Sequence, residues 1–330
     1  MNENRPAHIS LVSCMKNEGM FVVEWLAHHL GLGFDRVTVF TNDCTDGTDA
    51  LLSRLQELGY VRHIDHAPPP GSSPQISAMG IAMSDPTITN TDWLLHIDAD
   101  EFVDVVEGDI HDFVARFGDQ ADIIALFWKL FGDNGIEKWE GGSVVQQFSR
   151  AQDRPMRRVV HHKSLFRPSR FGRCTDHMPK DPRTKDVRVI NTRGERLPNT
   201  SVFHRSKSRY KAKFHQLTFD NACLNHYSIK SRDLFLMKNH RGDGHGVAHT
   251  RYHLGSELHR NYNRNEIEDR QILRHAPKTA AIMARIREDA GVRALEAQAM
   301  KLYVETRDRV LTPEQIDAWT LKTETEGVSR

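Results

Sequence analysis

Three carboxylates stand close together in the stretch WLLHIDADEF, which covers residues 93–102. Asp98, Asp100 and Glu101 directly follow a run of apolar residues that reads as a buried strand. Carboxylates this close repel one another unless a cation lies among them, and either a surface lysine or a metal ion would serve. Side chains alternate along a strand, so Asp98 and Asp100 point to the same side. Such a pair of oxygen ligands suits Mg²⁺ or Mn²⁺, which also hold substrate phosphates.

An Asp-x-Asp pair is a weak signal by itself, because about one is expected by chance in a chain of this length. Its plain interpretation is a solvated turn in which Glu101 caps the next element. The pair follows a predicted fourth strand, and this position favours a ligand site, because ligands of α/β sheets bind beyond the carboxyl ends of the strands.

A second polar stretch, TNDCTDGT at residues 41–48, follows another predicted strand and opens a helix. Asp46, Thr45 and Thr48 are residue types that cap a helix by bonding its free backbone N–H groups. A functional role places Asn42 or Asp46 against a nucleotide base or ribose, as acidic residues do at this position in nucleotide-binding sheets. The two roles are compatible, with Thr45 or Asp46 as the cap and Asn42 as the nucleotide contact.

The first half of the chain alternates between strand and helix periodicity, which predicts a parallel sheet with helices on both faces. The predicted strands cover 8–15, 36–41, 61–65 and 91–98, and the predicted helices cover 17–33, 46–60 and a turn or more around 76–83. In such sheets ligands bind beyond the carboxyl ends of the strands. The stretches KNE (16–18), TNDCTDGT and DADE (98–101) all lie at those ends, so we expect them to converge on one crevice.

The chain beyond residue 103 is less regular. We expect strands at 122–131, 163–168, 199–205 and 222–228, a helix at 207–219, and mostly helical structure from about 255, clearest at 278–310. The predicted fold is α/β, Rossmann-like, with a mostly parallel sheet and a helical C-terminal segment. Its predicted divisions are a domain at 1–250, with halves at 1–105 and 106–250, and an extension at 251–330.

Composition narrows the function classes. Lys and Arg number 45 against 44 for Asp and Glu, a net charge of +1 that argues against a nucleic-acid binder. No stretch is apolar enough to span a membrane, and the N-terminus lacks the layout of a secretory signal. The four cysteines show no CxxC spacing and predict free thiols in the cytoplasm. We expect most of the 19 histidines to lie at the surface or on helices.

Several motifs together resemble a known family. The order of CMKNEGMFVVEWLAHHLGLGFDRVTVFTNDCTDGT, QISAMGIA and WLLHIDADEF resembles the nucleotide-sugar half of glycosyltransferase family 2-like enzymes. The closer match is a branch with KNE…EWL.HH and a later NHY..KS…F..K motif, here LNHYSIKSRDLFLMKNHRGDG at 224–244, which is also similar to glycosyltransferase family 92. The resemblance covers about 8–245. It implies a GT-A fold, a nucleoside-diphosphate sugar donor (UDP above all), Mn²⁺ or Mg²⁺, and an inverting transfer to a hydroxyl of a glycan or polysaccharide.

The resemblance also implies roles for single residues. Asp98 and Asp100 match the family's DxD motif and are both expected at the metal, with Asp100 favoured as the direct ligand and Asp98 favoured as the ribose contact. His226 resembles the histidine that completes the metal or diphosphate site, the alternative being a packed histidine beside Tyr227. Lys230 is expected to neutralise the diphosphate, although a surface lysine is a comparable interpretation. The nucleotide side of the site is completed by Asn17, Glu18, Asn42, Asp46 and Gln75.

One departure leaves the nucleotide open. Where many family 2 members have an Asp-Asp pair that binds the base, this chain has Thr41 and Asn42. An amide can still bond the edge of a uracil, but the Thr-Asn pair does not specify which nucleotide the donor carries.

An inverting transfer needs a base within hydrogen-bond reach of the acceptor hydroxyl. The candidates are Asp176, His177, Asp133 and Glu137, and in chain order the loop at 176–181 fits best. The stretch FGDNG at 131–135 resembles the family's acceptor-side loop, and Asn-Gly by itself predicts a turn there.

Three other functions compete with this interpretation. A phosphohydrolase of the haloacid-dehalogenase type normally has Thr or Val where this chain has Phe102, and its DxD follows the first strand. A nucleotidyltransferase usually needs a Gly-rich basic loop after the first strand, which SCMKNEGM does not supply. A catalytically silent sugar-binding module would not need both carboxylates.

The segment from 255 most simply packs on the core. The alternative is contact with a partner or a membrane face, and the acidic residues of the segment disfavour anionic lipid. The oligomeric state is not readable from the sequence.

Overall fold

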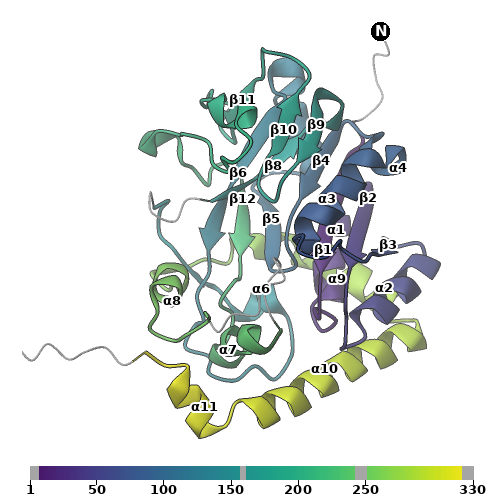
Figure 1. Cartoon of the computed structure of the whole chain (residues 1–330), viewed down its shortest axis with the longest axis vertical. Coiled ribbons are helices and arrows are strands. Elements are labelled where there is room, and N and C mark those ends of the chain that lie inside the picture. Colours follow the sequence, from purple (N-terminus) through teal and green to yellow (C-terminus); the bar gives the residue numbers. More distant parts are fainter. Residues whose placement is uncertain (1–6, 157–160, 242–250, 322–330) are drawn as a thin grey trace, which may run out of the picture.

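A computed structural model of the chain describes residues 7–156, 161–241 and 251–321. Its centre is a nine-stranded sheet in the order β3-β2-β1-β4-β8-β6-β12-β5, with β11 also paired to β6 (Figure 1). The strands of this sheet are β1 (Ile9–Met15), β2 (Arg36–Thr41), β3 (Arg62–Asp65), β4 (Trp93–His96), β5 (Glu101–Val105), β6 (Ile123–Leu130), β8 (His162–Phe166), β11 (Val189–Asn191) and β12 (Ala222–His226).

The first four strands pair in parallel, with β1 between β2 and β4 and with β3 outside β2. The second half is mixed, because β8 runs antiparallel to both β4 and β6 and β5 runs antiparallel to β12. Parallel pairs still predominate, since β6 pairs in parallel with β11 and with β12. The predicted α/β class and mostly parallel sheet are confirmed, in an arrangement that a GT-A resemblance implies.

Helices cover both faces of the sheet (Figure 1). The two faces follow from strand alternation, because Leu11 of β1 joins one apolar cluster and its neighbour Val12 joins the other. The first cluster includes residues of α1 (Val22–Gly31) and α2 (Thr48–Glu57), and the second includes residues of α3 (Pro74–Ser84). Shorter helices are α4 (Pro86–Thr89), α5 (Ile110–Ala115), α6 (Val144–Gln147) and α8 (Glu257–Tyr262).

Two predictions for the second half are wrong. The segment 199–205 is no strand but contains a 3₁₀ helix at Thr200–Phe203, because the carbonyl oxygens of Ser201 and His204 accept hydrogen bonds from the Lys180 ammonium at 2.7 and 2.9 Å. The segment 207–219 is not a helix either, apart from a 3₁₀ turn at Phe214–Gln216. It is rich in exposed basic residues, so no apolar face holds a longer helix against the core.

The C-terminal part is helical and belongs to the main core. It contains α9 (Ala276–Ile286), α10 (Ala290–Val310) and α11 (Pro313–Ala318). α9 packs on α1, and α10 packs on α2 and on α7 (Arg232–Arg241). The predicted continuous segment 278–310 is broken before Ala290, where the Asp289 carboxylate accepts from the backbone N–H of Val292 at 2.9 Å and so caps α10. The chain divisions at residues 105 and 250 stay predictions.

Small two-stranded pairs complete the fold. β9 (Phe171–Cys174) pairs with β10 (Pro179–Pro182), and β7 (Arg150–Ala151) pairs with β13 (Ile267–Glu268). None of the helices within 7–156, 161–241 and 251–321 is both long and apolar enough to cross a membrane. All four cysteines are free thiols.

The histidines divide between helices, the surface and the interior of the molecule, and His28 and His29 of α1 are both helical and buried. Six of them are buried, and of the described histidines only those at 204, 215 and 240 are fully exposed. The buried rings pack as flat aromatic groups: the His28 and His29 rings each lie against Phe102, with centroids 5.3 and 5.9 Å away. Their ring nitrogens bond backbone atoms, as His28 does to the Val103 carbonyl at 2.7 Å.

Candidate active site

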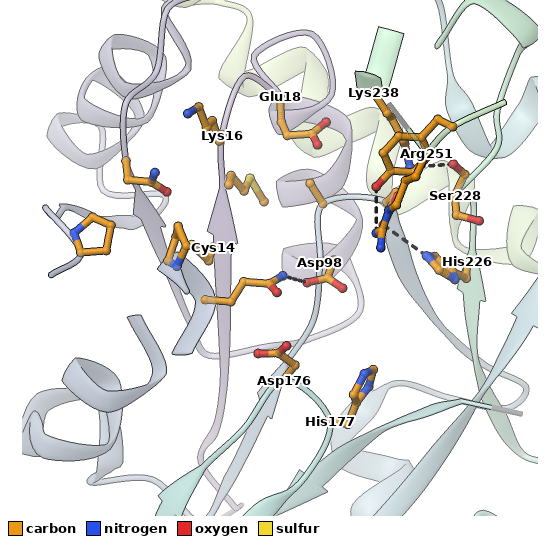
Figure 2. A pocket seen from close by; sticks show the side chains of 18 of the residues that line it. Cys14, Lys16, Glu18, Asp98, Asp176, His177, His226, Ser228, Lys238 and Arg251 are labelled. Carbon is orange, nitrogen blue, oxygen red and sulfur yellow. Dashed lines mark hydrogen bonds and ion pairs between the residues drawn. The ribbon is translucent and has the colours of Figure 1, made fainter. Parts of the chain in front are cut away.

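A pocket of about 800 Å³ opens at the carboxyl ends of β1 and β4 (Figure 2). This is the crevice that the strand order predicts. Eight of the eleven predicted site residues line it: Glu18, Asn42, Gln75, Asp98, Asp100, Asp176, His177 and His226. In Figure 2, Asp98 lies between Glu18 on one side and Asp176 and His177 on the other. A volume of this size is typical of small-molecule sites.

The other three predicted residues, Asn17, Asp46 and Lys230, line a second pocket of about 430 Å³ that shares Lys16 and Lys238 with the first. Asn17 and Asp46 join two loops: the Asn17 amide bonds the Thr45 backbone and hydroxyl at 2.8 and 3.0 Å. The Asp46 carboxylate accepts from the backbone N–H of Gly19 at 3.0 Å, and from that of Thr48 at 2.9 Å.

Asp46 thus bonds the free N–H of the first residue of α2, although the N-cap position itself is Gly47, and its contacts fix the loop after β1 against the loop after β2. Lys230 is buried, with a left-handed backbone (φ 54°), and its ammonium lies 4.6 Å from the centroid of the Phe21 ring.

The carboxylate turn Asp98–Glu101 joins β4 to β5 and is held from several sides. The Glu101 carboxylate accepts from the backbone N–H of Asp98 at 2.7 Å. The Trp25 indole N–H, on α1, donates to the carbonyls of Asp98 and Glu101 at 3.2 and 3.0 Å. On the opposite side, the backbone N–H of Tyr227 donates to the Asp100 carbonyl at 2.8 Å. Glu101 is fully buried, so the turn is not the solvated cap of the plain interpretation.

Asp98 is held by two side chains from different elements. The Lys163 ammonium, on β8, donates to Oδ2 at 3.0 Å and lies 3.6 Å from the Glu101 carboxylate. The Gln75 amide, on α3, donates to Oδ1 at 2.7 Å. A lysine buried in the sheet is therefore the cation that faces Asp98 and Glu101.

Asp100 has a separate pair of partners. Its Oδ1 lies 3.4 Å from Nε2 of His226, and its Oδ2 accepts from the Lys238 ammonium, on α7, at 3.1 Å. Lys238 also donates to the Ser228 carbonyl at 2.6 Å. The His226 ring packs against Trp128, with centroids 4.1 Å apart, so this histidine is both packed and directed at the carboxylate.

These contacts decide the charges in the pocket. Burial would raise the pKa of Asp98 and Asp100, but Lys163 and His96 beside Asp98, and Lys238 and His226 beside Asp100, hold both pKa values below the usual range. Burial outweighs Lys163 at Glu101 and raises the pKa of that carboxyl well above normal. The pocket therefore presents two ionised aspartates, each with its own lysine.

The donor set fits a divalent metal in part. Within the part of the chain that the structure describes, no group of three His, Cys, Asp or Glu side chains is placed to hold a metal ion. Asp100 and His226 provide one oxygen and one nitrogen donor that face each other at 3.4 Å, a set that Mn²⁺ accepts when waters and phosphates supply the remaining ligands. Both oxygens of Asp98 are already bonded to Gln75 and Lys163, which makes Asp98 a poorer ligand.

Asp176 and His177 lie in the loop between β9 and β10 and line the pocket. His177 Nδ1 lies 3.1 Å from the His162 carbonyl, and burial followed by the Lys163 charge lowers its pKa to about 3. Asp133 and Glu137, the other base candidates, do not line the pocket. Asp133 instead accepts from Asn263 at 2.8 Å, where it fixes the loop at 131–135.

Lys163 and Lys238 are site residues that the sequence prediction missed. Lys163 lies in a strand in which all five residues are buried, the lysine included. A lysine in a predicted buried strand was a usable signal, because lysine is almost never fully buried without a partner. Lys238 is the final lysine of the NHY..KS…F..K motif. Its ammonium lies 3.1 Å from the Asp100 carboxylate.

Comparison with known proteins gives a family. The model of glycosyltransferase family 92 matches residues 10–275. A glycosyltransferase family 92 protein of Ricinus communis is 23% identical over 238 residues, which is 67% of this chain and 35% of that protein. The chain thus spans about a third of the length of that relative.

Solved structures give weaker likenesses. TarS 1–349 of S. aureus in complex with UDP-GlcNAc is 13% identical with a TM-score of 0.30, covering 49% of this chain and 45% of that one. Glucosyl-3-phosphoglycerate synthase of Mycobacterium tuberculosis, in complex with Mn²⁺, UDP and glucosyl-3-phosphoglycerate, is 19% identical with a TM-score of 0.26, covering 37% and 44%. The family model spans most of the sequence and every residue that lines the pocket, so this chain belongs to glycosyltransferase family 92.

Proposed function

We propose that this chain transfers a sugar from a nucleoside-diphosphate sugar, with UDP as the nucleotide, to a hydroxyl group of a glycan, with inversion at the anomeric carbon. The observation that carries the proposal is the pocket at the ends of β1 and β4, where Asp98 and Asp100 each face a lysine. Membership of family 92 supports it. The carboxylates of this pocket suit a ribose or a metal ion, and its lysines suit a diphosphate. A nucleoside-diphosphate sugar contains both a ribose and a diphosphate, and therefore fits the pocket.

The donor nucleotide is assigned to the β1–β2 side of the pocket. Asn42 is only 4% exposed and lines the pocket wall, where its amide would bond the base. Asp98 would accept from the ribose hydroxyls. Lys238 is the cation that would meet the diphosphate next to Asp100, and the role of Lys230 in the same task stays a prediction.

Asp100 and His226 would hold a divalent cation, Mn²⁺ or Mg²⁺. When bound, such an ion neutralises charge that develops on a leaving diphosphate. Lys238 bonds the same carboxylate, so this lysine would either share Asp100 with the ion or turn toward the phosphates. A buried carboxylate with a low pKa is ready to bind a cation at neutral pH without first losing a proton.

The chemical step is a direct displacement. The acceptor hydroxyl oxygen attacks the anomeric carbon, the bond from that carbon to the diphosphate oxygen breaks, and a base takes the hydroxyl proton. Asp176 is the better candidate for the base, because proton uptake by a carboxylate removes charge, whereas proton uptake by the buried His177 ring would add a positive charge near Lys163. His177 would then position the acceptor beside Asp176.

An aromatic wall supports the placement of the acceptor. Trp128 and Tyr262 line the pocket near His177, and the Trp128 and His161 rings stack with centroids 4.8 Å apart. Sites for neutral polar ligands commonly combine aromatic faces with a few fixed polar groups, and a sugar acceptor matches this wall.

The test is calorimetric titration of the purified chain with UDP, in Mn²⁺ and in chelator, followed by turnover of UDP-sugars. We expect UDP to bind more tightly with Mn²⁺ and the product glycoside to have inverted configuration. Release of inorganic phosphate from simple esters would instead indicate a phosphohydrolase. Equal UDP binding in chelator, without turnover, would indicate a silent binding module and contradict the proposal.

A further inference from the structure

Lys163 occupies an unusual position for a lysine. It lies in β8, at the centre of the sheet between β4 and β6, and its residue exposure is 0%. Lysine is almost never fully buried unless it is paired, so its partners indicate what it does. Its ammonium contacts the Asp98 carboxylate at 3.0 Å and lies 3.6 Å from the Glu101 carboxylate.

Those partners fix one side chain of the pocket. Asp98 is bonded by Lys163 at Oδ2, by Gln75 at Oδ1, and through its backbone N–H by Glu101. Its side chain is nevertheless 27% exposed, and it lines the pocket. A carboxylate has about four lone-pair sites, so two remain for a ligand after these contacts. Asp98 is therefore held in one orientation while it stays able to accept further hydrogen bonds.

We propose that Lys163 is a positioning residue for the nucleotide: from inside the sheet it holds the Asp98 carboxylate in the one orientation that accepts the ribose hydroxyls. This inference rests on the proposed function, because it assigns the ligand of Asp98. It adds a residue whose effect on binding is transmitted through Asp98, since the ammonium itself is covered by the sheet.

A second buried ion pair in the same sheet serves as a matched comparison. Lys129 of β6 bonds the Asp269 carboxylate, and both side chains are less than 10% exposed (9% and 4%). Neither residue lines the pocket. The substitution K129M removes a buried lysine of the same kind and so reports the purely structural cost of such a loss.

The experiment measures UDP affinity by calorimetry, together with the melting temperature, for the wild type, K163M, D98N, K163M/D98N and K129M. The wild type must bind UDP; if it does not, the proposed function fails and not this inference. We expect K163M to weaken UDP binding by about tenfold or more, as loss of a charged hydrogen-bond partner does. K129M should lower the melting temperature and leave UDP affinity unchanged.

The double variant shows whether Lys163 acts through Asp98. If it does, K163M/D98N binds UDP no more weakly than D98N, because the orientation of a lost carboxylate no longer matters. Additive losses would overturn the inference, as would wild-type affinity in K163M. If K163M does not fold, the comparison of D98N with the double variant decides, because removing both charges leaves no unpaired lysine or aspartate in the sheet.

Discussion

Asp98 and Asp100 are two positions apart, yet their partners differ. Asp98 is bonded by a lysine from inside the sheet and by an amide from α3, whereas Asp100 meets a histidine at the end of β12 and a lysine from α7. The first aspartate is thus fixed by the rigid sheet, and the second faces groups that a ligand can rearrange. This difference supports a ribose role for Asp98 and a metal role for Asp100.

Replacement of Asp100 tests the metal role directly. D100N should remove the dependence of UDP affinity on Mn²⁺ and lower kcat by about 10²–10³-fold, because charge stabilisation of several kcal/mol is lost. Calorimetry with and without Mn²⁺ and initial rates measure the two effects. D119N, at a fully exposed aspartate, is the control and should change neither. Retained Mn²⁺ dependence in D100N would contradict the assignment.

Replacement of Asp176 tests the base. D176N keeps the size of the side chain but cannot take a proton, so kcat should fall by about 10²–10⁴-fold. UDP affinity should stay within about twofold of the wild type, because the proposed role of Asp176 is toward the acceptor and not the nucleotide. A loss in UDP affinity equal to the loss in kcat would instead place Asp176 on the donor side.

At the scale of elements, α7 carries Lys238 to Asp100, and α10 holds α7 in place. Arg307 of α10 is 2% exposed; its guanidinium donates to the Trp139 carbonyl at 3.0 Å and to the Asp233 carboxylate, near the start of α7, at 3.3 Å. Tyr303, one turn earlier, donates to the same carboxylate at 3.0 Å. α10 therefore supports α7 and, through it, one side of the pocket (Figure 1).

R307M should lower the free energy of unfolding by about 3 kcal/mol, because it leaves the Asp233 carboxylate buried without its guanidinium. Denaturant unfolding gives this value. R309M, at an exposed position of the same helix, should change stability by less than about 0.5 kcal/mol. Equal stability of R307M and wild type would show that α10 does not brace α7 through this arginine.

At the scale of the whole molecule, buried histidines make stability depend on pH. Burial lowers the pKa of His28 and His96 from 6.5 to about 4, and also holds that of His162 well below 6.5. The unfolded chain takes up these protons below about pH 6.5, while the folded protein does not. The contribution to stability is thus fully present above pH 6.5 and is lost as pH falls toward 4.

Thermal unfolding at pH 8, 6.5, 5 and 4 should therefore show a constant melting temperature down to about pH 6.5 and a steep fall below it. H28Q removes one of the groups that take up a proton on unfolding, so the free energy of unfolding should fall less steeply with pH, by about 1.4 kcal/mol per pH unit. The glutamine amide can still donate to the Val103 carbonyl, so the hydrogen bond of His28 is kept. H204Q, at an exposed histidine, is the comparison and should keep the wild-type slope.

The sequence by itself determined the first half of the fold and the place of the site. Local periodicity decides whether a segment is a strand or a helix, and parallel strands bring their carboxyl ends to one edge, so DADE and TNDCTDGT had to converge. Asp98 and Asp100 were readable in this way, whereas the loop at 176–181 was chosen from chain order and from the family resemblance.

Only the tertiary structure decided which cation meets which carboxylate. Lys163 and Lys238 lie 65 and 138 residues beyond their aspartates in the chain, so no local pattern pairs them. The same reason explains the missed segment 199–205, in which the carbonyl oxygens of Ser201 and His204 bond the distant Lys180 ammonium. Pairings between distant segments depend on packing in three dimensions, and sequence spacing does not record it.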